Sequence, residues 1–288
     1  MGRSDRLPFL VEVVDTWAMR RILLLLLILL AGCTASPPTA LPSPTDTLVS
    51  TDTLVPTLPS TPTTPATGVW RPLFVGAEVL ETADGFTVVR HFPTSVVYGG
   101  SFESASERGK QVSGWLDEDD QALVAVNCGF YQENGGAYQH MGLLMVNGEG
   151  WSELRSNWGG VLIVRDGQAF IAPRPERLLA PATLGLQGWP MLVQNQTVVS
   201  RLNDEDLGRR TAVGVDAQGR LVWVVARNGI TLADFAQRLR DSDLGLVIAV
   251  NLDGGVSSGL RWRAPEGEGQ EGPDSLPIPC AIRLGPIG

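Results

Sequence analysis

The sequence has few of the residues on which nucleic-acid binding and metal chemistry depend. It contains only two histidines, charged residues make up 18% of the chain, and the formal net charge is -9. Proteins that bind nucleic acids present a basic face to the phosphates, and no stripe of lysine and arginine is present. A nucleic-acid partner is therefore not expected. The sequence also lacks a His-x-His pair and a repeated set of aspartate and histidine ligands, so we expect neither a metal nor another cofactor.

Long apolar runs are also scarce, and the strongest one lies near the N-terminus. Residues 22–30 are almost all leucine; they follow Met19 and two arginines and precede Leu-Ala-Gly-Cys, which ends at Cys33. A charged start, a short apolar core and small residues are typical of a secretory signal, and the ending resembles a bacterial lipobox. We expect residues 1–33 to contain a signal peptide whose true start is Met19. A lipid on Cys33 is expected to anchor the exported chain to the outer face of the cell membrane. The alternative is a transmembrane anchor, for which the run falls short of the roughly 20 residues required.

Residues 34–67 contain no aromatic side chain, and their only charges are Asp46 and Asp52 among threonine, proline and serine. Such a composition provides nothing to form a core and keeps the chain extended. We expect a disordered tether here, followed by one folded domain over residues 68–288. A monomer is the default expectation for that domain.

Short apolar segments dominate the expected domain and favour β structure. Asn147-Gly148 and Asp166-Gly167 follow such segments and predict tight hairpin turns. A helix is predicted over residues 231–240, where a capping threonine starts an amphipathic pattern, and a weaker one within residues 102–116. The sequence therefore predicts an α+β fold with mixed, mostly antiparallel sheets and two or more packed helices in a single domain. The predicted strands are 86–90, 95–98, 122–126, 142–146, 161–165, 169–172, 211–215, 221–226 and 246–250.

The most informative motif directly follows the predicted strand 246–250. Its asparagine and aspartate alternate with a leucine, so both polar side chains point to one face. The two glycines leave room for a ligand or another backbone, and the two serines offer hydroxyl and N–H groups to an anion. The plainer alternative is a turn whose aspartate caps its own backbone. The candidate residues are Asn251, Asp253, Gly254, Gly255, Ser257 and Ser258.

A second motif places polar residues after another predicted strand. Asn127 and Gly129 follow the strand 122–126, and Glu133 and His140 lie in the loop beyond them. Loop glutamates are mostly solvated and a lone histidine is more often structural than catalytic, so a purely structural role is the alternative for both residues.

A third motif stands at the entry of the predicted strand 211–215. Arg210 and Thr211 open this strand, and a second arginine precedes them. Paired arginines protect a strand edge from aggregation, or they form a fork for a phosphate or carboxylate.

Five blocks of sequence together point further than any single motif. They are AVNCGFY with HMGLLMVNGE, GWPMLVQNQ, GRRTAVGVDAQGRLVWVVA, GITLADFAQRL, and AVNLDGGVSSGL with IPCAIRL. In this order they resemble the phosphodiester glycosidase family over about residues 75–286. The resemblance implies a hydrolase that cleaves the sugar C1–O bond of a glycosyl 1-phosphodiester, such as an N-acetylglucosamine 1-phosphodiester, in envelope or extracellular glycans.

The resemblance also implies roles for the motif residues. A phosphate is a weakly basic leaving group, so its expulsion needs less acid help than an ordinary glycoside does. Arg210 is expected to bind the phosphate and Asp253 to stabilise charge at C1 or activate water, with Glu133 as a reserve acid or base. Substrate-binding roles are expected for Asn127, Gly129, His140, Thr211, Asn251, Gly254, Gly255, Ser257 and Ser258.

The sequence departs from the family pattern at several positions, and His140-Met141 stands where proline is common. Val256 stands where a third glycine is frequent, and Cys128 and Cys280 stand where small residues or asparagine are more usual. The two cysteines form either a disulfide, which an exported domain permits, or two buried thiols. The alternative functions are a non-catalytic glycan-binding lipoprotein and a phosphodiesterase that cleaves the P–O bond.

Overall fold

The computed structural model describes residues 68–173 and 182–288, which belong to the second of two compact units, Pro59–Gly288. The expected signal peptide, its Cys33 and the expected tether lie outside the described residues. Within the described ranges, no helix is both long and apolar enough to cross a membrane.

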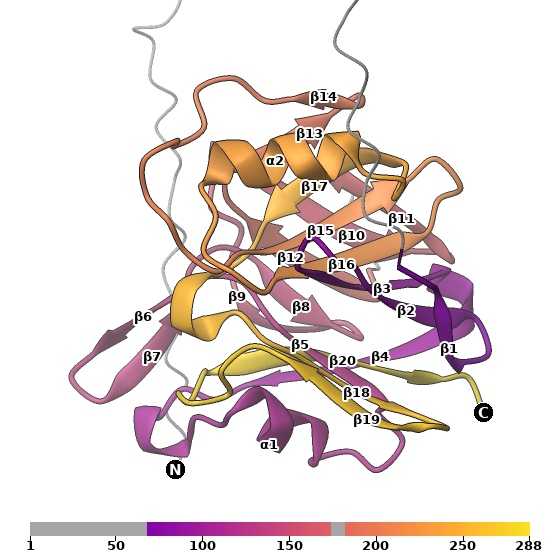
Figure 1. Ribbon diagram of the computed structural model, residues 1–288. Coiled ribbons are helices and arrows are strands. Elements are labelled where there is room, and N and C mark those ends of the chain that lie inside the picture. The colour runs from indigo at the N-terminus through magenta and orange to yellow at the C-terminus, as the bar shows by residue number, and fades with distance from the viewer. Residues whose placement is uncertain (1–67, 174–181) are drawn as a thin grey trace, which may run out of the picture. The chain divides into compact units, whose positions relative to one another are not determined.

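An eight-stranded antiparallel sheet is the largest layer of the fold (Figure 1). Its strand order pairs β15 with β17, and this register places Asn251 opposite Ala212. The strand order therefore brings the end of the predicted strand 246–250 beside the start of the predicted strand 211–215. The strands, in spatial order, are β1 (Arg71–Phe74), β2 (Ala77–Glu81), β3 (Phe86–His91), β16 (Leu221–Ala226), β15 (Thr211–Asp216), β17 (Leu246–Asn251), β13 (Met191–Gln194) and β14 (Thr197–Val198).

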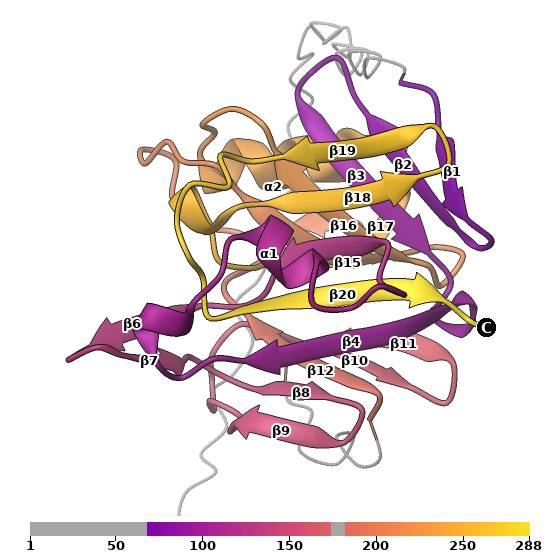
Figure 2. The same ribbon diagram turned by 90° about the horizontal axis from the view of Figure 1, so that it is seen from below.

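Two five-stranded antiparallel sheets and one hairpin complete the β structure (Figure 2). The first five-stranded sheet contains, in spatial order, β19 (Gly267–Glu271), β18 (Leu260–Ala264), β5 (Val124–Asn127), β20 (Cys280–Pro286) and β4 (Val96–Phe102). The second contains β11 (Gln168–Ala172), β10 (Gly160–Arg165), β12 (Leu184–Gly188), β8 (Leu144–Val146) and β9 (Glu149–Ser152). The hairpin consists of β6 (Tyr131–Asn134) and β7 (Ala137–His140).

The predicted hairpin turns are confirmed. Asn147 and Gly148 both have positive φ, 51° and 82°, between β8 and β9, and Asp166 and Gly167 do the same, 52° and 70°, between β10 and β11. Such angles match the twist of the flanking strands, and asparagine, aspartate and glycine tolerate them best.

Two α-helices occur in the described residues, and only one matches its prediction. α2 (Leu232–Asp241) confirms the helix expected over 231–240, and its Thr231 hydroxyl accepts a hydrogen bond from the Asp234 N–H at 3.0 Å. The helix expected within 102–116 is wrong over most of its length, because α1 (Val112–Leu116) has five residues. The chain before it pairs with β20 as β4 up to Phe102, and a short 3-10 helix, η2 (Ser106–Arg108), follows.

One hydrophobic core lies among the three larger sheets. Trp223 of the eight-stranded sheet, Leu284 of the sheet with β5 and Leu186 of the third sheet are all fully buried in it. α2 covers the opposite face of the eight-stranded sheet, where Phe235 meets Phe86 edge-to-face (Figure 1). α1 covers the outer face of β5 and β20.

The molecule is therefore mainly β, and the expected α+β class with several packed helices is not confirmed. The sheets are antiparallel throughout the described residues, in keeping with the mostly antiparallel expectation. Each apolar sheet face needs a cover. Here the sheets bury most of one another's faces, so two helices suffice for the remainder.

Candidate active site

A buried cluster of polar side chains joins the eight-stranded sheet to the sheet that contains β5. Asn127 ends β5, and Thr211 starts β15. The Thr211 hydroxyl donates to Asn127 Oδ1 at 2.9 Å and lies 3.1 Å from the Ser258 hydroxyl. Asn127 Nδ2 donates to the backbone carbonyl of Asp253 at 2.9 Å. The structure thus brings all three sequence motifs together around one buried asparagine.

The carboxyl group of Asp253 lies in a small cavity beside this cluster. Burial raises the pKa of Asp253 to about 6, although hydrogen bonds from the Ser257 side chain and the Gly254 N–H lower it. At neutral pH the group is mainly a carboxylate that still binds a proton readily, which suits a general base. The cavity is too narrow to hold a water molecule, and its lining includes Asn127, Cys128, Gly129, Tyr131, Asp253, Ser257 and Cys280.

The two glycines after Asp253 are required by the backbone around them. The Gly255 N–H donates to the Arg209 carbonyl at 2.8 Å, and Gly255 has a φ of 61°. A Cβ on Gly254 would lie 2.9 Å from that same carbonyl oxygen. The chain then forms the 3-10 helix η3 (Gly255–Ser257). The structure gives the glycines a packing role, and their expected role in substrate binding stays a prediction.

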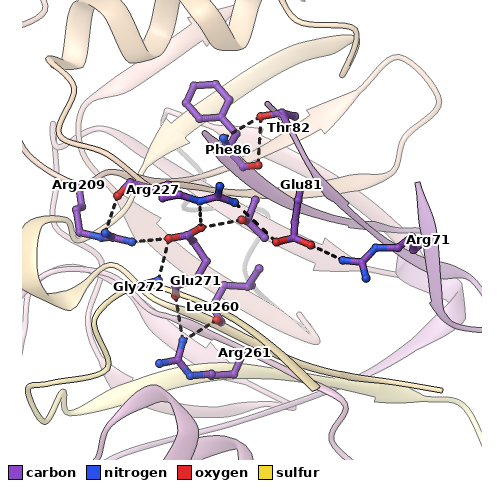
Figure 3. Close-up of polar contacts among 11 residues, drawn as sticks. Arg71, Glu81, Thr82, Phe86, Arg209, Arg227, Leu260, Arg261, Glu271 and Gly272 are labelled. Carbon is purple, nitrogen blue, oxygen red and sulfur yellow. Dashed lines mark hydrogen bonds and ion pairs between the residues drawn. The ribbon is translucent and has the colours of Figure 1, made fainter. Parts of the chain in front are cut away.

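Arg209 is in turn held by a buried acid that the sequence motifs did not include (Figure 3). Glu271 ends β19 and is 6% exposed. Its carboxylate accepts hydrogen bonds from Arg209 Nη2 at 2.6 Å, Arg227 Nε at 2.9 Å and the Thr87 hydroxyl at 3.0 Å. Burial raises the pKa of Glu271, but these donors outweigh burial and hold it below its usual value. The network therefore fixes one end of the Asp253 loop through the carbonyl of Arg209.

Arg210 lies beside the same loop and is partly engaged by backbone. Its Nε donates to the Ile230 carbonyl at 3.0 Å and its Nη2 to the Asp206 carbonyl at 2.6 Å. Burial lowers its pKa, and the charge of Asp206 opposes this shift. Its Cδ is 4.0 Å from the place of a Cβ on Gly254. Among the described residues no acceptor bonds to Nη1, so this nitrogen is the one left for a ligand.

Four of the residues expected in the site line the cavity, namely Asn127, Gly129, Asp253 and Ser257. Arg210, Glu133 and His140 are among those that do not. Glu133 is exposed on the hairpin β6–β7. His140 is buried at the end of β7, where Nδ1 donates to the Gly142 carbonyl at 2.8 Å. Burial lowers the pKa of His140 to about 4, so its ring is neutral at pH 7.

Cys128 and Cys280 form a disulfide with their Cα atoms 5.8 Å apart, which decides between the two alternatives of the sequence. It joins the residue after β5 to the start of β20. The sulfur atoms and a ring nitrogen of His140 lie within 4.8 Å of one another. Metal ligation by cysteine requires thiolates, so these residues offer no metal site while the disulfide is intact.

Asn251 does not line the cavity, whereas Tyr131, for which the sequence predicted no role, does. Asn251 Nδ2 donates to the Trp189 carbonyl at 2.9 Å, and its Oδ1 is buried with no partner among the described residues. Tyr131 was not expected in the site, yet it lines the cavity and its hydroxyl is 3.4 Å from the Ser257 hydroxyl. The signal for Tyr131 was present, because it belongs to the block that contains Asn127.

Comparison with known proteins decides the family. A family model described as phosphodiester glycosidase matches residues 120–282, more than half of the chain, and this range includes Asn127, Thr211 and Asp253. The chain belongs to the phosphodiester glycosidase family. The expected resemblance is therefore confirmed, and membership supports a glycosidase-type hydrolase function. No curated protein matches the chain.

Solved structures share the fold of this member of the phosphodiester glycosidase family. A hypothetical protein from Synechocystis is 17% identical with a TM-score of 0.56; the match covers 77% of this chain and 64% of that one, less than two thirds of its length. The zebrafish N-acetylglucosamine-1-phosphodiester alpha-N-acetylglucosaminidase catalytic domain, auto-inhibited by its pro-peptide, is 17% identical with a TM-score of 0.53, covering 73% of this chain and 78% of that one. At these identities the likeness establishes the fold alone.

Proposed function

We propose that this phosphodiester glycosidase hydrolyses the sugar C1–O bond of a glycosyl 1-phosphodiester. The observation that carries the proposal is the position of the Asp253 carboxyl group beside Asn127 and Ser257, where burial raises its pKa to about 6. The zebrafish relative is named for an N-acetylglucosamine 1-phosphodiester, so this compound is our first candidate substrate.

The reaction needs one base and a place for the leaving phosphate. The C1–O bond to phosphorus breaks, and its electron pair leaves with the phosphomonoester, which is weakly basic and needs little protonation. Water attacks C1, and the carboxylate of Asp253 takes the water proton or stabilises the positive charge at C1. The Asn127 amide contacts the backbone of Asp253, which holds the carboxylate in place.

Arg210 is proposed to bind the leaving phosphate through Nη1, because its Nε and Nη2 donate to backbone carbonyls. A cation that meets the developing charge favours the transition state. The Ser257 side chain hydrogen-bonds Asp253 and the Ser258 hydroxyl lies 3.1 Å from the Thr211 hydroxyl, and both are proposed as further groups for the phosphate. Glu133, the expected reserve acid or base, lies exposed on the hairpin outside the cavity, and the proposed reaction does not use it.

We also propose that the protein is exported and anchored by lipid on Cys33, where it acts as a monomer on envelope or extracellular glycans. The Cys128–Cys280 disulfide supports this placement, since disulfides persist in oxidising compartments. Mass spectrometry of the mature N-terminus tests the lipid, and Cys33→Ser is expected to release the protein from the membrane fraction.

The activity test uses the full chain with a panel of sugar 1-phosphodiesters, N-acetylglucosamine first, followed by phosphorus and anomeric proton NMR. Free sugar and a phosphomonoester are the expected products. Asp253→Asn and Arg210→Ala are expected to lose turnover while remaining folded. Asp84→Asn is the matched control, because it removes an exposed carboxylate outside the site.

Other products would assign another function. Release of a sugar 1-phosphate means P–O cleavage and a phosphodiesterase. Saturable binding with no turnover means a glycan-binding protein. Either result contradicts the proposed glycosidase.

A further inference from the structure

A row of three aromatic side chains lies outside the small cavity. Phe130 meets the Trp158 ring edge-to-face with their centroids 5.5 Å apart. Trp158 and Trp189 are stacked, with 1° between their planes and 6.5 Å between their centroids. None of the three lines the cavity of Asp253, and Trp189 is 47% exposed. The row therefore presents one large aromatic ring to solvent.

Both ends of this row are tied to the candidate active site. Phe130 directly follows Gly129, which lines the cavity. The backbone N–H of Trp189 donates to the backbone carbonyl of Asn251 at 2.8 Å, and Asn251 Nδ2 donates back to the backbone carbonyl of Trp189 at 2.9 Å. Asn251 is two residues before Asp253, so the backbone of Trp189 is bonded to the segment that carries the proposed base.

The row is also held in place before any ligand binds. The buried side chain of Gln187 accepts from the Arg155 N–H at 2.9 Å and donates to the Arg155 and Trp158 carbonyls at 2.8 Å and 2.7 Å. A Cβ on Gly142 would lie 2.8 Å from the Trp158 ring, so this ring packs directly on backbone. Fixing a loop and two indoles in this way reduces the entropy lost when a ligand binds.

Trp189 is 47% exposed, and its stacking on Trp158 does not account for this exposure. Ligand sites commonly combine aromatic surface with a few polar groups, and a stacked pair of indoles near the polar cluster offers this combination. A pyranose ring has a face of C–H groups that can pack against an indole. A flexible polyol chain such as glycerol has no such face. The position outside the cavity matches the part of a substrate that extends away from the bond that is cleaved.

We propose that Trp189, supported by Trp158, is a stacking subsite for a pyranose ring on the aglycone side of the phosphate. The inference rests on the proposed function and deepens it. It makes Trp189 a specificity-determining residue that selects a saccharide aglycone over a glycerol-type one.

The test uses the full chain and two esters of the same sugar 1-phosphate, one to O6 of methyl glucopyranoside and one to glycerol. The wild type is expected to prefer the pyranoside ester in kcat/KM by about tenfold. Trp189→Ala is expected to lose this preference through a higher KM, with little change on the glycerol ester, and Trp189→Phe to retain part of it. Phe92→Ala is the matched control, because Phe92 is an exposed aromatic residue (44%) outside the site.

A binding arm separates this subsite from the proposed chemistry. Calorimetry of full-chain Asp253→Asn is expected to show tighter binding of methyl glucopyranoside 6-phosphate than of glycerol phosphate, and Trp189→Ala to remove the difference. If no phosphodiester is hydrolysed but this difference is found, the subsite stands and the proposed function fails. If turnover occurs and Trp189→Ala lowers both esters equally, or neither, the subsite is wrong and the proposed function stands. Preference for a uridine ester over the pyranoside ester overturns the subsite in favour of a base-stacking one.

Discussion

Two strand ends with similar sequences use their asparagines in different ways. Asn127 ends β5, and both ends of its amide are engaged: Oδ1 accepts from Thr211 and from the Gly259 N–H, and Nδ2 donates to the Asp253 carbonyl. Asn251 ends β17, and its amide makes one bond, to the carbonyl of Trp189. The first asparagine connects two sheets and a loop, whereas the second holds a neighbouring tryptophan.

The segments that follow the two asparagines also differ, one being exposed and the other compact. After Asn127 it passes Gly129 and continues into the exposed hairpin β6–β7. After Asn251 it enters the compact loop whose Gly255 N–H is bound by Arg209. The comparison teaches that a shared motif places a polar group at a strand end, and that its buried partners then decide what the group does.

The largest effect is expected from Asp253→Asn, which removes the proposed base and keeps the shape of the loop. Catalysis by a positioned base contributes about 10²–10⁴-fold, so kcat/KM should fall by about that factor. In the wild type, kcat/KM should rise as the pH passes through about 6, because only the carboxylate is active. Initial rates between pH 4 and 8 check both statements. A profile without an inflection near pH 6 would remove Asp253 from this role.

Next in size, Asn127→Ala should destabilise the protein more than Asn251→Ala. The first change removes three hydrogen bonds, with the Thr211 hydroxyl, the Gly259 N–H and the Asp253 carbonyl, at a cost of about 3 kcal/mol, and the second removes one, at about 1 kcal/mol. Urea unfolding of the two variants measures the difference. Equal losses would show that the two strand ends do not differ as proposed here.

A smaller effect is expected from a single methyl group in the loop. The Cβ of Gly254→Ala would lie 2.9 Å from the Arg209 carbonyl oxygen, so the backbone must shift, at a cost of about 1–3 kcal/mol. Gly150→Ala is the matched control, since no atom lies within 4 Å of its added Cβ. Thermal unfolding of both variants should show a lower Tm for the first alone.

The raised pKa of Asp253 also predicts an effect on stability. Its pKa in the folded protein, about 6, is above the usual 3.8, so its contribution to stability is full below about pH 4 and is lost as the pH rises through 6. Asp253→Asn lacks this loss and should be more stable than the wild type at pH 8 by about 3 kcal/mol, with little difference in this term at pH 4. Urea unfolding at the two pH values tests the sign, and a variant less stable at pH 8 would contradict it.

The smallest effect is expected from Glu133→Gln on the hairpin. The side chain is exposed and lies outside the cavity. The free energy of unfolding should therefore change by less than about 0.5 kcal/mol, and kcat by less than about twofold. A large loss of kcat would restore Glu133 as a catalytic acid or base and bring the hairpin into the active site.

Much of the local structure followed from the sequence. The Thr231 cap and amphipathic pattern predicted α2, and Asn147-Gly148 and Asp166-Gly167 predicted their turns, because these features depend on neighbours in the chain. The helix within 102–116 failed because pairing with β20, far along the chain, makes its first residue the end of a strand. Local propensity does not report such long-range pairing.

For the candidate site, the chain alone determined which residue types stand at the strand ends, and through them the family. The tertiary structure alone decided which of these meet: Asn127 with Thr211 and Asp253, but neither Glu133 nor His140 in the cavity. It alone placed Glu271 on Arg209 and Trp189 beside Asn251. The physical reason is that motifs follow from the short-range order of the chain, whereas contacts and burial follow from how the sheets pack on one another. Burial then sets the pKa of Asp253 and selects the partners of each polar group.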